Sequence, residues 1–142
     1  MEISDVRKRL QRVIEEARRT AAGRRAGIDA ASAAYEAFLP RVAAPLFRQL
    51  ANALTAEGHP FTLSTPAGSL RLVSERWPQD FIEIELDASG ERPVVIGRVG
   101  RGRGSRVMRT ERPIREDAKV EELTEDDVLE FVLKEIAPLV ER

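Results

Sequence analysis

The sequence predicts an α+β fold with a long N-terminal helix, a second helix, an antiparallel β-meander of about five strands and a C-terminal helix packed on one sheet face. Apolar residues recur at helical spacing over residues 1–58, alternate over residues 59–115, and return to helical spacing near the C-terminus. A chain of 142 residues fits one domain, so we expect a single α+β domain over residues 1–142. Its last part, residues 116–142, is expected to be a linker and the C-terminal helix.

The first helix carries an apolar stripe on one side, made by Val6, Leu10, Val13 and Ala17. Arginine and glutamate occupy most of the other positions, as on a helix that buries one face only. We expect this helix to continue to Leu39 and to end at Pro40, although a break near residues 23–27 stays open. The stripe predicts that two copies of the chain pair through this helix, with the four apolar residues as the dimerisation site.

Small residues recur in the second half of this helix, where Gly23, Gly27 and Ala31 lie four apart on one face. Such a face lets another helix approach closely. The same pattern is equally typical of an alanine-rich helix that makes no such contact, and the sequence leaves both interpretations open.

A second helix is predicted over residues 45–58, with proline at its start and glycine just past its end. The apolar period then changes to two. Residues 61–63 and 70–72 flank a turn at residues 65–69 that contains proline and glycine, which predicts a hairpin.

Residues 81–87 alternate between an apolar face and an acidic face formed by Glu83, Glu85 and Asp87. If Leu86 pairs with Val95 of the next strand, residues 94–99, antiparallel register places Ile84 opposite Gly97 and Glu83 opposite Arg98. Three carboxylates on one strand face are also compatible with a metal site or a glycosidase pair. We favour a solvated face offset by arginines of neighbouring strands, and we predict no metal site.

A glycine- and arginine-rich segment, residues 97–106, is the main candidate for binding. A further strand over residues 105–111 makes this segment the flexible tip of a hairpin. We expect its guanidinium groups to bind an anionic partner; the candidate residues are Arg98, Arg101, Arg103, Arg106 and Arg109.

Charge is strongly segregated in the last third of the chain. Residues 91–115 hold eight basic and two acidic residues, whereas residues 116–142 hold three basic and ten acidic ones. The two blocks can neutralise each other within one fold or between two copies, which favours a protein partner over nucleic acid. Within the acidic block, Thr124 and Asp127 have the spacing of a capping box at the start of the C-terminal helix.

Known catalytic patterns are not found. The chain has no cysteine and a single histidine, His59, and it has neither a phosphate-binding loop nor a nucleophile elbow. No apolar run is long enough for a membrane span. We therefore predict no cofactor, no membrane contact, and a reducing, cytoplasmic location.

Taken together, these features predict a non-enzymatic, cytoplasmic protein-protein interaction or regulatory module. It is expected to be homodimeric through the N-terminal helix and to contact an acidic protein surface through the arginine-rich hairpin. One alternative is a nucleic-acid-binding accessory protein that uses the same hairpin. Another is a small-molecule binder or enzyme with a pocket near His59 and Trp77.

Overall fold

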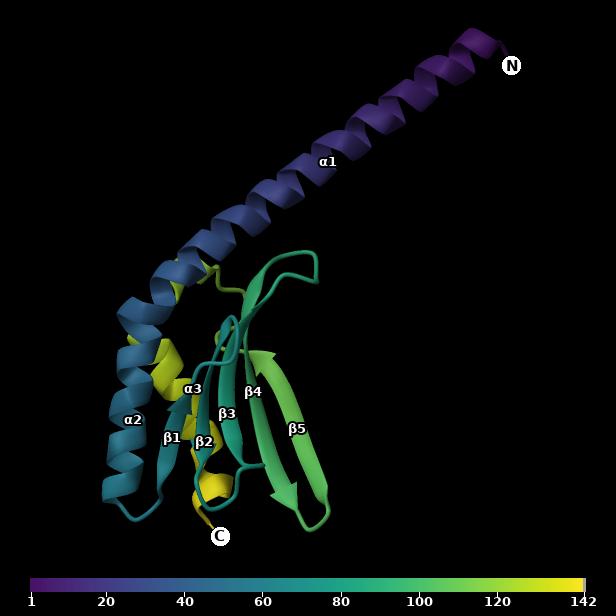
Figure 1. Ribbon diagram of the computed structural model, residues 1–142. Helices are drawn as coiled ribbons and strands as arrows, with labels where there is room; N and C mark the ends of the chain where they lie inside the picture. Colours follow the sequence, from purple (N-terminus) through teal and green to yellow (C-terminus); the bar gives the residue numbers. More distant parts are fainter. Residues whose placement is uncertain (142) are drawn as a thin grey trace.

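The computed structural model describes residues 1–141. Five strands form one antiparallel sheet in chain order, and the helices precede and follow it (Figure 1). This order confirms the predicted α+β fold. The elements are α1 (Ile3–Phe38), the π-helical turn η1 (Leu39–Ala43), α2 (Ala44–Ala56), β1 (Phe61–Ser64), β2 (Ser69–Ser74), β3 (Phe81–Asp87), β4 (Val94–Arg103), β5 (Arg106–Pro113), the short 3-10 helix η2 (Val120–Glu122) and α3 (Glu125–Val140).

The first α-helix ends at Phe38, close to the predicted end at Pro40, but it is not separated from the second helix. Helical structure continues from α1 through η1 into α2, and the chain bends there without a break (Figure 1). Proline lacks the N–H that an α-helical turn requires. In η1 the N–H of Ala44 donates to the carbonyl of Leu39, five residues back, as in a π-helix.

α1 is continuous through Gly23 and Gly27, as predicted, and extends well beyond the rest of the protein (Figure 1). Its buried residues, Ala31, Tyr35 and Phe38, all lie in its last quarter, whereas residues 1–20 are exposed throughout. Below, residues 3–20 are called the free half of α1 and residues 24–38 the docked half.

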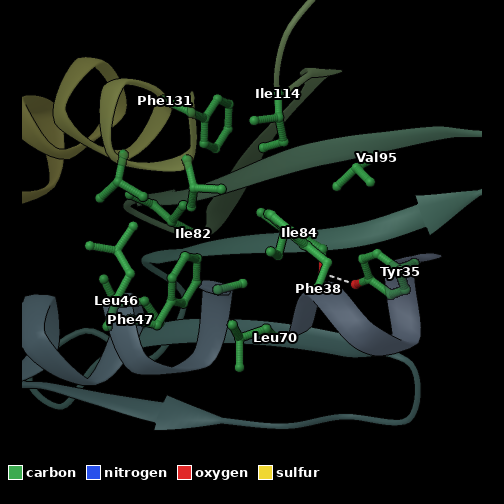
Figure 2. Close-up of a cluster of buried hydrophobic side chains, with 14 of the residues drawn as sticks. Tyr35, Phe38, Leu46, Phe47, Leu70, Ile82, Ile84, Val95, Ile114 and Phe131 are labelled. Atoms are coloured by element: carbon green, nitrogen blue, oxygen red, sulfur yellow. Dashed lines mark hydrogen bonds between the residues drawn. The ribbon is translucent and has the colours of Figure 1, made fainter. Parts of the chain in front are cut away.

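The hydrophobic core lies between one face of the sheet and the helices. Phe47 of α2 and Phe131 of α3 pack on the same face, over Ile82 and Ile84 of β3 (Figure 2). The predicted packing of the C-terminal helix on the sheet is therefore confirmed. The start of α3 has the expected capping box, in which Thr124 Oγ1 accepts from the N–H of Asp127.

The central strands pair in the predicted register. Leu86 lies opposite Val95, Ile84 opposite Gly97, and Glu83 opposite Arg98. A Cβ atom on Gly97 would overlap the ring of Phe131, so glycine is required where α3 crosses β4.

Candidate interaction surfaces

The arginine- and glycine-rich segment is mainly a regular strand, not the flexible tip that the sequence suggested. β4 runs to Arg103 and β5 begins at Arg106, so only residues 104–105 form the turn. Gly104 alone in this turn has a positive φ, of 58°. The hairpin of β4 and β5 is called the basic hairpin below.

Two glycines of β4 provide room for packing. A Cβ on Gly100 would overlap the ring of Phe81, and a Cβ on Gly102 would crowd the side chain of Gln79. The N–H of Gly102 also donates to Oδ1 of the buried Asp80, at 2.8 Å. These contacts pack β4 against β3 and the two residues before it, which explains how a glycine-rich segment forms a regular strand.

Arg98 forms ion pairs with three glutamates on its own face of the sheet. Its Nε donates to Glu111 at 2.6 Å, and its other nitrogens lie 3.3 Å from Glu85 and 3.6 Å from Glu83. The hydrogen bond to Glu111 raises the pKa of Arg98 above its usual value. Its predicted role in partner binding is therefore not supported.

The acidic face of β3 is paired with arginines, as the sequence favoured, but it is not uniformly solvated. Glu83 is only 4% exposed, accepts a hydrogen bond from Ser69 Oγ at 2.8 Å, and forms an ion pair with Arg71 at 3.1 Å. Hydrogen bonds from the hydroxyl and N–H of Ser89 lower the pKa of Asp87. Within residues 1–141, no cluster of three or more potential ligands could hold a metal ion.

Of the other four candidate arginines, Arg103, Arg106 and Arg109 are exposed, whereas Arg101 is half-buried and its Nε is enclosed. Arg101 and Arg103 follow Val95 and Gly97 at even spacings along β4, and Arg106 lies directly opposite Arg103. All three arginines therefore lie on the side of the hairpin that faces α3. Arg109 lies on the opposite side, with its guanidinium carbon 5.9 Å from the centre of the Phe81 ring. Among the described residues, none of these four arginines forms an ion pair within the chain.

The acidic C-terminal block neutralises different arginines. Glu135 of α3 accepts from Arg112 Nε at 2.9 Å, and Asp127 pairs with Arg115 at 3.2 Å. Burial tends to raise the pKa of Asp127, but hydrogen bonds from Thr124 and Arg115 outweigh it, and the net shift is downward. The ion pairs within the chain thus do not include the arginines next to the turn of the basic hairpin.

The free half of α1 presents the predicted dimerisation residues to solvent. Leu10 is 56% exposed and Val13 62%, and Val6 and Ala17 are also exposed. Ile3 continues the same spacing toward the N-terminus and is 85% exposed. We call Ile3, Val6, Leu10, Val13 and Ala17 the apolar stripe.

A groove lies where α1 meets the loops after β3 and β5. Its volume is about 650 Å³, and its lining includes Gly23, Gly27, residues 91–94 and residues 116–121. Arg24 bounds it by donating to the carbonyl of Gly90 at 3.2 Å. A Cβ on either glycine would meet nothing within 4 Å. The small residues were visible in the sequence, but the groove was not, because its other wall comes from loops far along the chain.

The alternative site near His59 and Trp77 has little room. The cavity lined by these two residues measures about 20 Å³, far below the several hundred Å³ of typical metabolite sites. The structure gives a small-molecule function at this place no support.

Tyr35 is a buried polar residue that the sequence did not single out. Its hydroxyl donates to the carbonyls of Gly68 and Ile84, at 3.1 and 3.4 Å, and so ties α1 to the sheet (Figure 2). Burial, together with the charges of Glu85 and Glu83, raises its pKa well above the usual value of 10.0. It therefore stays protonated and acts as a structural hydrogen-bond donor.

Comparison of the chain with protein-family models, curated proteins and solved structures finds no significant match. In the described part of the chain, no helix is both long enough and apolar enough to cross a membrane.

Proposed function

We propose that this protein is a non-enzymatic interaction module of the cytoplasm. In this proposal it forms a homodimer through the free half of α1 and contacts an acidic protein surface through the basic hairpin. The observation that carries it is the exposed apolar stripe, on a helix that extends away from the core. The absence of cysteine fits a reducing compartment.

The stripe supports self-association on energetic grounds. Isolated helices shorter than about 12–15 residues are marginal in water, and most helices in proteins are stabilised mainly by packing of one face. The free half of α1 has no such packing within the chain, since all of residues 1–20 are exposed. Apolar residues at alternating intervals of three and four are also the pattern by which two helices pair in a coiled coil.

Light scattering coupled to size exclusion tests the dimer. We expect the native protein to have twice the mass of one chain, and Leu10→Asp or Val13→Asp to shift it toward the monomer. Gln11→Asp is the matched control, because it adds the same charge beside Leu10 on a side of α1 away from the stripe. A native protein that is monomeric at all concentrations would contradict this part of the proposal.

The basic hairpin supports the second contact. Four guanidinium groups without ion pairs in the described chain lie on one hairpin. Arginine forms bidentate hydrogen bonds with carboxylates. The notable lack of aromatic side chains on this hairpin disfavours stacking on nucleic-acid bases. An acidic protein surface therefore fits better than a single-stranded nucleic acid.

A pull-down distinguishes the two partners. The bait is the protein or its triple variant Arg101→Ser, Arg103→Ser, Arg106→Ser, each with and without nuclease treatment. We expect the triple variant to lose a protein partner that nuclease treatment does not release. A triple variant in α1, with Arg12, Arg18 and Arg19 changed to serine, removes the same charge elsewhere and should retain the partner. Capture that disappears with nuclease would favour the nucleic-acid alternative, and equal capture by both triple variants would reject the hairpin as the binding site.

A further inference from the structure

The apolar stripe lies on the same side of α1 as the buried residues of the docked half. Eighteen residues make about five full turns of an α-helix, so side chains eighteen positions apart share one side. Val13 and Ala31 are such a pair, as are Ala17 and Tyr35. Because Ala31 and Tyr35 are buried against the protein, the stripe lies on the side of α1 that carries the sheet and its loops. In Figure 1 the loop between β3 and β4 indeed rises toward α1 from that side.

This direction restricts how two copies can pair. In a parallel pair, the stripes would face each other across an axial distance of about 8–10 Å. The sheet of each copy would then lie on the inner side of its helix, close to the shared axis. Both sheets would lie at the same height along this axis, directly after the paired region. A five-stranded sheet is roughly 20 Å wide, so the two sheets would compete for the same space.

We propose that two copies pair the free halves of α1 antiparallel, with Leu10 of each helix opposite Val13 of the other. This inference rests on the proposed function, because it specifies the geometry of the same dimer. The remaining layers then place Val6 opposite Ala17 and Ile3 opposite Thr20 of the second copy. Larger side chains near the tip of one helix meet smaller ones near the base of the other, which gives layers of similar volume.

Charge complementarity supports the same register. Arg9 and Glu16 flank the stripe on one side, and the antiparallel register brings Arg9 of each copy beside Glu16 of the other. The two residues are seven positions apart, or nearly two turns, so they do not pair within one helix. In a parallel pair, by contrast, their cross-helix neighbours are Ile14 and Ala21, which carry no charge.

The groove accounts for the end of the paired region. With Ile3 opposite Thr20, the first residues of one helix lie beside Gly23 of the other, at the mouth of the groove. Space is open at this glycine, since an added Cβ would meet nothing within 4 Å. In this register the paired region spans the whole free half of α1 and ends where the groove begins.

Disulfide crosslinking tests the arrangement in the intact protein, which has no cysteine of its own. Val6→Cys and Ala17→Cys variants, one of them carrying a tag that changes its mass, are mixed and oxidised. We expect the mixed disulfide to dominate and each variant alone to crosslink poorly. In a parallel pair the two positions are separated by about 16 Å along the axis, and each variant would instead crosslink with itself.

The outcomes separate the two proposals. A monomer in light scattering would refute the dimer and with it this geometry. A dimer that forms self-disulfides would overturn the antiparallel geometry and leave the proposed function standing. A dimer that forms neither disulfide would show that the helices do not pair in this register. Circular dichroism of each variant confirms that the helix is retained.

Charge reversal provides an independent readout. Arg9→Glu and Glu16→Arg should each weaken dimerisation roughly two- to tenfold, because exposed ion pairs are individually weak. The double variant should return toward the wild-type dissociation constant. Arg12→Glu, away from the stripe, serves as the control for a change of net charge. Additive weakening in the double variant would contradict the antiparallel register.

Discussion

The two halves of α1 share one apolar side and differ in what covers it. In the docked half, Tyr35 and Phe38 are buried under the sheet and its loops, whereas in the free half Leu10 and Val13 are more than half exposed. The same spacing thus has two outcomes along a single helix. The difference shows that apolar periodicity indicates a partner on one side of a helix without telling whether that partner belongs to the same chain.

The largest contrast is expected from truncating one side chain in each half. Phe38→Ala should lower the free energy of unfolding by about 3–5 kcal/mol, because the buried ring leaves a cavity. Leu10→Ala should change it by less than about 0.5 kcal/mol at concentrations where the protein is monomeric. Chemical denaturation followed by circular dichroism measures both. Equal losses would mean that the free half is packed within the monomer.

Alkaline pH should affect the docked half through Tyr35. The pKa of Tyr35 is raised in the folded state, so above pH 10 the unfolded chain loses this proton while the folded chain retains it. Stability contributed by the protonated hydroxyl is therefore complete below pH 10.0 and declines above it, by up to about 1.4 kcal/mol per pH unit. Denaturation of wild type and Tyr35→Phe between pH 9 and 11 tests this. The variant should lack this part of the decline, and identical slopes would argue against a buried hydroxyl.

A smaller effect, a gain in stability, is expected near the start of the docked half. Gly27→Ala should stabilise the monomer by about 0.5–1 kcal/mol, since alanine favours the helix and its Cβ has open space. Gly97→Ala is the opposite control, because its Cβ would overlap the Phe131 ring and should destabilise the protein. Thermal unfolding of both variants gives the comparison. Destabilisation by Gly27→Ala would indicate that the groove is closed.

The smallest effect is expected from deleting residues 1–20. The shortened protein should unfold with a free energy within about 0.5 kcal/mol of the monomeric wild type, because the deleted residues bury nothing in the chain. Its light-scattering mass should be that of a monomer. A large loss of stability would contradict the description of this half as unpacked.

Local patterns predicted much of the fold. The alternation in residues 81–87 and a single assumed pair gave the register of β3 and β4, and Thr124 and Asp127 marked the start of α3. The π-helical turn that joins α1 directly to α2 was not predicted, because nothing in the local sequence distinguishes such a turn from a break.

The candidate site was predicted less completely. Arginine content identified the basic hairpin, but only the pairing across strands shows that Arg98 is bound by three glutamates while Arg101 and Arg103 are not. The groove beside Gly23 and Gly27 is formed by segments about sixty-five to one hundred residues further along the chain. Such long-range neighbours leave no local signal.

Light scattering of the native protein across a concentration series tests the central claim most directly. Pairing of the free halves of α1 predicts a mass of twice 15.9 kDa that falls to one chain on dilution or in Leu10→Asp, and that is unchanged in Gln11→Asp. A mass of 15.9 kDa at every concentration, or a dimer that Leu10→Asp leaves intact, would contradict it.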